Sequence, residues 1–283
     1  MILIADSGAT KTTWAAVWPN GRYELFTSTG CNPNYTGGSS IKESIMAAFP
    51  KSLMPEEVTE LYFYCAGLDE NAAGDFRLLF GEMFPNLYRY ECEDDLTGAA
   101  RALLPDGRKG LVAILGTGSN SGYYDGERIT EHVDCMGFIL GDEGSGAYIG
   151  KRYIQDFLRK NMPENVYSVA KDVLPGRDDI IGNIYRGRRP SRYCASFCRD
   201  IAEHLDDDPY YRNLVRDSFR AFFREVVCRY DNYTERPLSC VGSIASVFEK
   251  ELREVAAESG VGIWRIMKEP IHGLVEHHCR IQD

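Results

Sequence analysis

The amino-acid sequence predicts an α/β protein of two related domains, each with a mixed sheet flanked by helices. One observation is length, because 283 residues exceed the usual size of a single hydrophobic core. The other is a repeat. An apolar strand, a turn rich in Gly, Ser and Thr, and a second strand occur at 2–14 and again at 111–124. Such a repeat favours two related halves with a cleft between them, although two glycine-rich hairpins can also resemble each other by chance.

Composition and charge narrow the range of functions. The chain is 44% hydrophobic and 26% charged, as globular proteins are, and its formal net charge is −10. Because nucleic acids and anionic membranes attract basic surfaces, neither is expected as the main partner. An acidic residue at position 6 argues against a signal peptide and no apolar stretch could span a bilayer, so a soluble cytoplasmic protein is expected. The nine dispersed cysteines lack a C-x-x-C pair, which favours reduced thiols over disulfides or a zinc site.

The N-terminal half begins with an antiparallel meander. Strands are expected at Ile2–Ala5, Thr12–Trp18 and Tyr23–Ser28, and Asn20-Gly21 favours a tight turn because both residues tolerate positive φ. Helices and strands then alternate, with a helix at 39–49, a strand at 61–66, a helix at 70–83, a strand at 88–92, and a helix that opens at Asp94-Asp95. The order is therefore βββαβαβα.

The second half repeats the meander after a connector rich in helix breakers, Pro105–Gly110. We expect domains at 1–110 and 111–269, with a C-terminal helix at 270–283 that joins the first domain. Strands are expected at 111–115, 121–124 and near 128–133, followed by a glycine-rich segment that opens a long helix through Leu158. Each such glycine weakens a helix by roughly 1 kcal/mol relative to alanine, so close backbone contacts are expected. Most of 163–233 is expected to be helical, followed by a strand at 238–241, a helix to about 258, and a strand at 263–267.

Two groups of side chains have simple explanations. The five histidines lack metal-ligand spacing, and the C-terminal pair His277 and His278 is expected on an exposed helix. The aromatic stretch from Tyr210 to Phe223 is expected to pack in a core or at a subunit contact, and a homodimer is one arrangement that would bury it.

The two hairpin tips carry residues that can hold phosphate. Neither a G-x-x-x-x-G-K-[ST] loop nor a dinucleotide-binding G-x-G-x-x-G segment occurs in the chain. The first tip contains Asp6, Gly8, Thr10 and Thr12, and the second contains Gly116, Thr117, Gly118 and Ser119. Amides and hydroxyls at such tips can bind phosphate, and Asp6 can hold a magnesium ion through water. Each motif is weak alone, because glycine and threonine also populate ordinary turns.

Two further segments make the set specific, namely Gly141-Asp142-Glu143-Gly144-Ser145-Gly146 and Val241-Gly242-Ser243-Ile244-Ala245-Ser246. With them the chain resembles the N-acetylglucosamine kinase and BadF/BadG-type ATPase family of the actin, hexokinase and Hsp70 superfamily. The resemblance extends from Ile2 to about Leu274. It implies two ribonuclease H-like domains with an interdomain cleft for ATP and substrate.

The resemblance also implies roles for individual residues. The two tips would hold the nucleotide phosphates, and Thr10 and Thr117 would contact these phosphates. Gly242 and Ser246 would belong to an adenosine-binding turn. The sugar-binding residues would be Asn32, Asp95, Asp142 and the segment Cys135, Met136 and Gly137. The family often has Gly-Gly-Trp-Gly where this chain has Asp134-Cys135-Met136-Gly137. Because this segment would line the sugar pocket, the resemblance defines the sugar less well than it defines the phosphoryl transfer.

Asp95 matches the aspartate that accepts the proton of the attacking hydroxyl in sugar kinases of this type. From the residues alone it could equally cap a helix, and the adjacent Asp94 leaves a one-residue ambiguity. Phosphoryl transfer depends mainly on positioning and charge neutralisation, so one carboxylate, a metal ion and donors to the γ-phosphate suffice.

Three functions fit these patterns. The first is ATP- and Mg²⁺-dependent phosphorylation of an amino sugar, with N-acetylglucosamine as the leading candidate and Asp95 as base. The second is a BadF/BadG-type activator ATPase coupled to a redox partner, which would need cysteines placed to ligate an iron–sulfur cluster. The third is a sensor that binds sugar or nucleotide without turnover. Dispersed thiols disfavour the second, and a plausible base disfavours the third.

Overall fold

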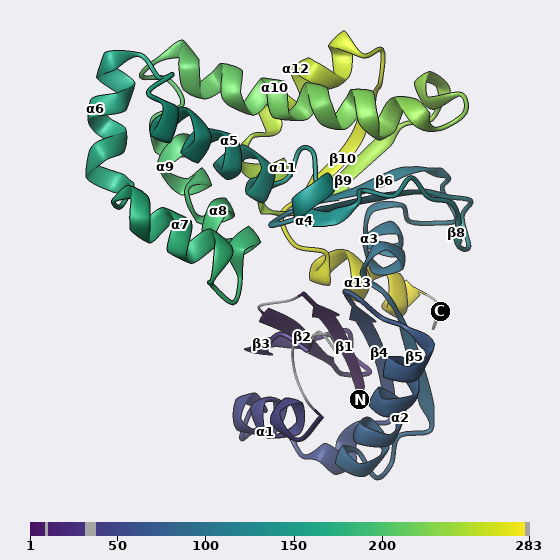
Figure 1. Cartoon of the computed structure of the whole chain (residues 1–283). Coiled ribbons are helices and arrows are strands. Elements are labelled where there is room, and N and C mark those ends of the chain that lie inside the picture. Colours follow the sequence, from purple (N-terminus) through teal and green to yellow (C-terminus); the bar gives the residue numbers. More distant parts are fainter. Residues whose placement is uncertain (9–10, 32–37, 281–283) are drawn as a thin grey trace. The chain divides into compact units, whose positions relative to one another are not determined.

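The computed structural model describes residues 1–8, 11–31 and 38–280 (Figure 1). It divides into two compact units, one comprising Met1–Pro105 with Pro270–Asp283, and the other Asp106–Glu269. Each unit is built on a five-stranded mixed sheet with flanking helices. The α/β fold class predicted from the sequence is confirmed.

Unit 1 has the strand order β3-β2-β1-β4-β5. The antiparallel meander consists of β1 (Ile2–Ser7), β2 (Lys11–Val17) and β3 (Tyr23–Thr29), while β4 (Glu60–Cys65) and β5 (Arg89–Asp94) run parallel to β1. Its helices are α1 (Gly38–Ala48), α2 (Glu70–Met83), α3 (Asp95–Leu103) and α13 (Ile271–Arg280), with a 3-10 turn at Pro55–Glu57.

Both faces of the unit 1 sheet are covered, because side chains alternate along each strand. One apolar cluster joins Leu3, Trp14 and Phe63 to residues of α1 and α2, such as Ile45 and Phe80. The cluster on the opposite face joins Ile4, Ala15 and Tyr62 to residues of α3 and α13, among them Ala102 and Leu274. Burial on both faces explains why β1 is continuously apolar.

The C-terminal helix corrects one expectation. His278 was expected on an exposed helix face, but it is only 4% exposed. Its ring stacks on that of Tyr62 with 3.7 Å between centroids, and its Nε2 lies 2.8 Å from the hydroxyl oxygen of Tyr64. Burial lowers the pKa of His278 to about 2, so the ring is neutral. Adjacent helical residues point about 100° apart, so a pair of histidines need not share a solvent face.

Unit 2 repeats the sheet topology of unit 1, with the order β10-β9-β6-β7-β8. The meander consists of β6 (Gly110–Leu115), β7 (Ser119–Tyr124) and β8 (Ile129–Glu131), while β9 (Leu238–Val241) and β10 (Ile263–Met267) run parallel to β6. When the second order is read in reverse, as β8-β7-β6-β9-β10, each strand occupies the position of its counterpart in β3-β2-β1-β4-β5. The repeat seen in the sequence therefore corresponds to a repeated sheet.

The helices of unit 2 are α4 (Gly137–Leu140), α5 (Gly146–Arg159), α6 (Glu164–Val173), α7 (Arg177–Tyr185), α8 (Pro190–Ser196), α9 (Cys198–Glu203), α10 (Pro209–Glu225), α11 (Ser243–Val247) and α12 (Glu249–Glu258), with 3-10 turns at Val227–Arg229 and Tyr233–Glu235. The expectation that 163–233 is mostly helical is confirmed. Within the aromatic stretch, Tyr211, Phe219, Phe222 and Phe223 are buried in the core of this unit. Of the two explanations for that stretch, the core is the one observed.

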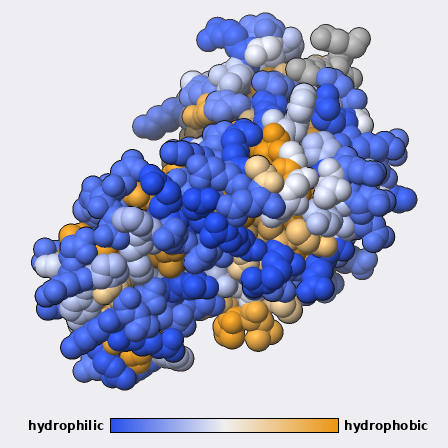
Figure 2. All heavy atoms as spheres, turned by 90° about the horizontal axis from the view of Figure 1, so that it is seen from above, coloured by the Kyte–Doolittle hydropathy of each residue, from blue (hydrophilic) through white to orange (hydrophobic). Residues whose placement is uncertain are grey.

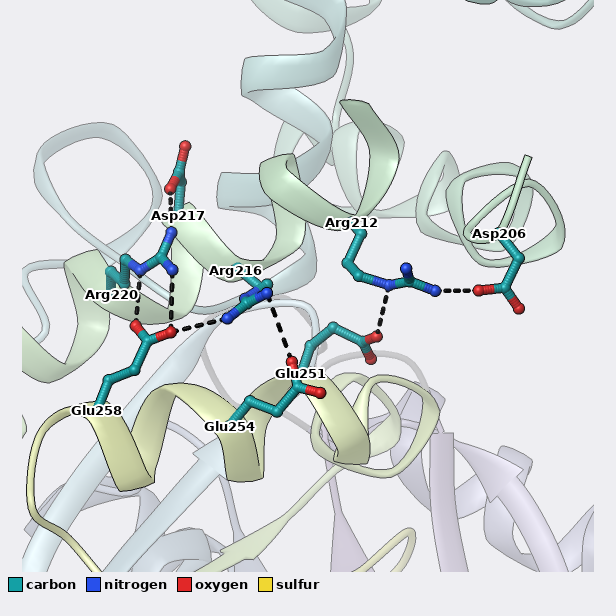
Figure 3. A network of polar contacts seen from close by, with 8 residues as sticks. All are labelled: Asp206, Arg212, Arg216, Asp217, Arg220, Glu251, Glu254 and Glu258. Carbon is teal, nitrogen blue, oxygen red and sulfur yellow. Dashed lines mark hydrogen bonds and ion pairs between the residues drawn. The ribbon is translucent and has the colours of Figure 1, made fainter. Parts of the chain in front are cut away.

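A charged network joins α10 to α12 (Figure 3). Arginines spaced four residues apart on α10 face three glutamates of α12; the pairs are Arg212 with Glu251, Arg216 with Glu254 and Glu258, and Arg220 with Glu258. Glu251 is only 2% exposed. Hydrogen bonds from Arg220 and Arg216 lower the pKa of Glu258 to about 2, so this carboxyl is ionised throughout the neutral range. Arg212, Arg216 and Arg220 are thus each paired with acidic side chains.

Hydrophilic side chains cover most of the molecular face seen in Figure 2, and hydrophobic ones form only small groups there. Within the part of the chain that the structure describes, no helix has both the length and the apolar character needed to cross a membrane.

A glycine sets the distance between α5 and α8. A Cβ atom on Gly150 would lie 1.8 Å from the carbonyl oxygen of Cys194 in α8, and backbone atoms cannot give way as a flexible side chain could. The glycine-rich start of α5 therefore serves close packing, as its composition predicted.

We expect the substitution Gly150→Ala to lower the free energy of unfolding by about 1–3 kcal/mol, because the added methyl group must push α8 off α5. Gly182→Ala is the matched control, since Gly182 lies inside α7 and a Cβ atom added there would meet no described atom within 4 Å. Thermal unfolding followed by circular dichroism at 222 nm measures both variants. Equal midpoints for the two would contradict the packing argument.

Candidate functional site

The hairpin between β6 and β7 is the centre of the candidate site in unit 2. Its turn is closed by the Gly116 amide, which donates to the Gly118 carbonyl oxygen at 3.0 Å. The first turn of α5 contacts it directly. The amides of Gly146 and Ala147 donate to the carbonyl oxygens of Gly116 at 2.9 Å and Thr117 at 3.0 Å. These bonds fix the position of the turn.

Asp142 holds the same hairpin at the start of β7. Its side chain is 7% exposed, and its Oδ1 accepts a hydrogen bond from the Ser119 amide at 3.2 Å. A Cβ atom on Gly118 would lie 3.0 Å from Oδ2, so any side chain at this position would crowd the carboxylate. The Asp142 amide in turn donates to the Cys135 carbonyl oxygen at 2.8 Å. In this structure Asp142 links the hairpin to the segment expected to contact sugar.

The buried position of Asp142 shifts the pKa of its carboxyl. Burial raises the pKa of its carboxyl above the ordinary value of 3.8, while the Ser119 hydrogen bond and the charge of Lys151 act in the opposite direction. The charged form is therefore less favoured here than in water.

The Cys135–Gly137 segment has an unusual backbone. Met136 has a φ of 55° and Gly137 a φ of 68°, both in the left-handed region. Met136 is exposed whereas Cys135 is buried, and burial raises the pKa of the Cys135 thiol. A protonated thiol is a poor nucleophile, so Cys135 can line a pocket but is unsuited to covalent catalysis.

Gly242 brings the start of α11 against the end of β6. Its φ is 129°, and a Cβ atom there would lie 2.2 Å from the Leu115 carbonyl oxygen. Its amide donates to the Met267 carbonyl oxygen at 2.9 Å, and the half-buried Ser246 follows one helical turn later. The absence of a side chain at Gly242 is what allows α11 to begin beside the hairpin.

A pocket of about 780 Å³ lies next to this hairpin. Gly116 and Thr117 line it together with Ser243, Ile244 and Val247 of α11. The remaining wall comes mainly from one face of α8 and α9 and includes Arg192, Ser196, Arg199 and, after β10, Lys268.

These α8–α9 residues and Lys268 were not predicted from the sequence. The lining positions 192, 195, 196, 198, 199, 202 and 203 follow the helical spacing of a single face. That periodicity was a usable signal for a shared face. Nothing in the sequence, however, connects the face with a hairpin some 80 positions earlier.

In unit 1, the carboxyl ends of three parallel strands meet at one edge of the sheet. The register pairs Ser7 of β1 with Cys65 of β4, and Cys65 with Asp94 of β5. The half-buried Asp6 and Asp95 therefore both lie at this edge. The predicted metal-binding carboxylate and the predicted base therefore lie at the same edge of the unit 1 sheet.

The first hairpin tip differs in detail from what was expected. The Gly8 amide donates to the Lys11 carbonyl oxygen at 3.1 Å, which closes the tip. Thr12 is fully buried, and its Oγ1 lies 2.8 Å from Ser7 Oγ. The Thr12 hydroxyl donates a hydrogen bond to the Thr29 carbonyl oxygen at 3.2 Å. The Thr12 hydroxyl, assigned above to ATP, thus supports the tip from inside. Thr10 and Asn32 lie outside the described residues.

The doubled acid separates into two positions. Asp94 is exposed and caps α3, because its Oδ1 accepts the Thr97 amide at 2.6 Å. Asp95 is the first residue of the helix and is half-buried. A Cβ atom on Gly98 would lie 2.8 Å from the Tyr64 ring, so the small residues of α3 serve close packing on β4. The capping explanation therefore applies to Asp94.

Metal-binding groups are sparse. In the described parts of the chain, no cluster of three or more His, Cys, Asp or Glu side chains could hold a metal ion. All nine cysteines are free thiols, and each is buried or half-buried. A metal ion at this site would need most of its ligands from a bound substrate or from water.

The raised pKa of Asp142 gives a prediction about stability. The folded state holds this proton to higher pH than the unfolded chain, so its contribution to the free energy of unfolding falls as the pH rises above about 3.8. Asparagine cannot ionise and keeps an oxygen for the Ser119 amide. We expect Asp142→Asn to raise the thermal midpoint at pH 7, with a gain that shrinks toward pH 4. Asp142→Ala, which removes the acceptor, should lower the midpoint at both pH values. An asparagine variant less stable than the wild type at neutral pH would contradict this.

The comparisons with known proteins agree with this architecture. No family model matches the sequence. A protein from Porphyromonas gingivalis, named provisionally as an N-acetylglucosamine kinase, is 34% identical over 100% of both chains, and its structure superposes with a TM-score of 0.93. A Chromobacterium violaceum protein with the same provisional name is 18% identical over 98% of both chains with a TM-score of 0.75, which shows the shared fold.

Among curated proteins, an N-acetylmuramic acid/N-acetylglucosamine kinase from Clostridium acetobutylicum is 27% identical over 126 residues. The matched region spans 42% of this chain and 41% of the Clostridium protein, less than two thirds of its length. The family therefore rests on the full-length similarity to the Porphyromonas protein. By that similarity, this chain belongs to the N-acetylglucosamine kinase family of ATP-dependent sugar kinases.

Proposed function

We propose that this protein transfers the γ-phosphate of ATP to a hydroxyl of an amino sugar, with N-acetylglucosamine as the first candidate. The observation that carries the proposal is the pocket of about 780 Å³ bounded by the β6–β7 hairpin and α11 in a chain of this family. Its volume is within the roughly 300–1,000 Å³ typical of small-ligand sites. An ATP-dependent reaction also fits the cytoplasmic location expected from the sequence.

The nucleotide phosphates are assigned to the two hairpin tips. At the second tip, the amides of Gly116 and Ser119 are used within the fold. Among the described residues, the amides of Thr117 and Gly118 have no backbone acceptor, and the Thr117 side chain is exposed. Two adjacent amides and a hydroxyl suit a phosphate group. Gly8 and Thr10 are assigned to the phosphates at the first tip, although the Gly8 amide itself is used to close that tip. Gly242 and Ser246 are assigned to adenosine.

Mg²⁺ is expected to arrive with the nucleotide. Asp6 supplies one carboxylate at the end of β1, and that fits an ion held mostly by phosphate oxygens and water. When bound, the ion would neutralise charge on the transferred phosphate.

Asp95 is assigned the role of general base. The attacking hydroxyl must lose its proton as its oxygen bonds to phosphorus, and a half-buried carboxylate that is not needed as a helix cap suits this task. Asn32, Asp142 and the Cys135–Gly137 segment are assigned to the sugar. One oxygen of the Asp142 carboxylate accepts a hydrogen bond from the hairpin, and the remaining lone pairs of the carboxylate can accept hydrogen bonds from sugar hydroxyls.

The BadF/BadG-type activator remains the second candidate function. A shared iron–sulfur cluster would need thiols that reach a subunit surface, whereas every cysteine here is buried or half-buried. We therefore favour the kinase.

An assay of ADP formation tests the proposal. The purified chain is incubated with Mg²⁺, ATP and one of N-acetylglucosamine, N-acetylmannosamine, N-acetylmuramic acid, glucosamine or glucose. We expect at least one acetylated sugar to stimulate ADP release, and omission of Mg²⁺ to abolish it. Turnover that no sugar raises above the background ATPase would refute the kinase function.

Separate substitutions of Asp94 and Asp95 test which of the two residues is the general base and which one caps α3. We expect Asp95→Asn to lower kcat by at least about 100-fold while nucleotide binding is retained, because a general base contributes on this order. Asp94→Asn is the matched control, since asparagine caps helices as well as aspartate does. It should keep both kcat and the thermal midpoint. The opposite pattern, with Asp94→Asn inactive and Asp95→Asn active, would move the base to Asp94.

A further inference from the structure

The pocket beside the β6–β7 hairpin has a positively charged wall. Arg192 of α8, Arg199 of α9 and Lys268 all line it, and all three are exposed. The lining also contains one carboxylate, Glu203, which leaves two net positive charges. The whole chain carries a formal net charge of −10, so the pocket departs in sign from the rest of the molecule.

These cations are also unpaired, in contrast with others in the same unit. Among the residues that the structure describes, Arg192, Arg199 and Lys268 make no ion pair with an acidic side chain. By comparison, Arg212, Arg216 and Arg220 of α10 all face glutamates or aspartates (Figure 3). An acidic chain that leaves three cations unpaired around one pocket favours an anionic occupant.

The packing of α8 places two of these charges close to the hairpin. A Cβ atom on Gly146 would lie 3.1 Å from the Ala195 Cβ and 3.3 Å from the Gly116 carbonyl oxygen, so Ala195 of α8 and the hairpin both pack against Gly146. Phe197 has helical φ and ψ and joins α8 to α9. Arg192 and Arg199 come three residues before and four after Ala195, which places both on the helical face that carries Ala195.

We propose that Arg192, Arg199 and Lys268 bind the phosphate chain of the nucleotide and form a second phosphate-recognition element beside the hairpin amides. The proposal rests on the proposed function, because it takes this pocket as the nucleotide site. Arginine can bind phosphate oxygens through two parallel hydrogen bonds, and lysine acts as a point charge. The pocket then selects its ligand by phosphate charge as well as by the nucleoside, and the affinity decreases with salt.

Isothermal titration of the full chain with ADP and with adenosine tests this. The test variant is Arg192→Gln with Arg199→Gln, and Lys268→Gln is measured separately. Arg188→Gln is the matched control, because Arg188 is an exposed arginine just before α8 that does not line the pocket. Thermal midpoints of all variants establish that each is folded.

We expect the double variant to weaken ADP binding by about tenfold or more, since hydrogen bonds to charged groups carry this much free energy. Lys268→Gln should weaken ADP binding in the same sense. Adenosine binding should stay unchanged, the salt dependence of ADP binding should become shallower, and Arg188→Gln should match the wild type. Unchanged ADP binding in the double variant, or equal losses for ADP and adenosine, would overturn the inference while the kinase proposal stands. A wild-type protein that binds neither ligand would refute both.

Discussion

The contact between α5 and the β6–β7 hairpin is the constraint on which the candidate site of unit 2 depends. Two amides at the start of α5 donate to the Gly116 and Thr117 carbonyl oxygens, and the Asp142 carboxylate takes the Ser119 amide. The turn is therefore held through two of its carbonyl groups and through the Ser119 amide, whereas in the described parts of the chain the Thr117 and Gly118 amides have no backbone acceptor. Gly242 adds α11 to the same place, because a side chain there would meet the Leu115 carbonyl oxygen. Glycines that weaken the helices as isolated elements are thus required for the elements to meet.

Local chemistry was enough to predict most of the fold. Apolar runs bounded by turn residues identified the strands, and the helix at Glu70–Met83 and the strand at Ile263–Met267 were predicted with their observed bounds. The repeated meander also predicted two related sheets, which share one strand order. Such features depend on residues close together in the chain, where periodicity and turn chemistry act directly.

Features that depend on distant contacts could not be predicted. The burial of His278 arises because its face of α13 packs on Tyr62 and Tyr64, more than 200 positions earlier. Which of Asp94 and Asp95 caps α3 depends on where the helix starts, and sequence patterns locate a helix start only to within a few residues. Arg192 and Arg199 line the pocket because close contacts at Gly150 and Gly146 allow α8 to pack on α5, and Lys268 lines it from the end of β10. No local signal carries that information.

Hydrogen–deuterium exchange with and without ADP tests most directly whether this pocket holds the nucleotide. If ADP binds there, exchange of backbone amides should slow at 116–119, at 192–199 and at 243–247, while α6 and α7 remain unchanged. Protection confined to other segments, at ADP concentrations that saturate binding, would contradict the assignment.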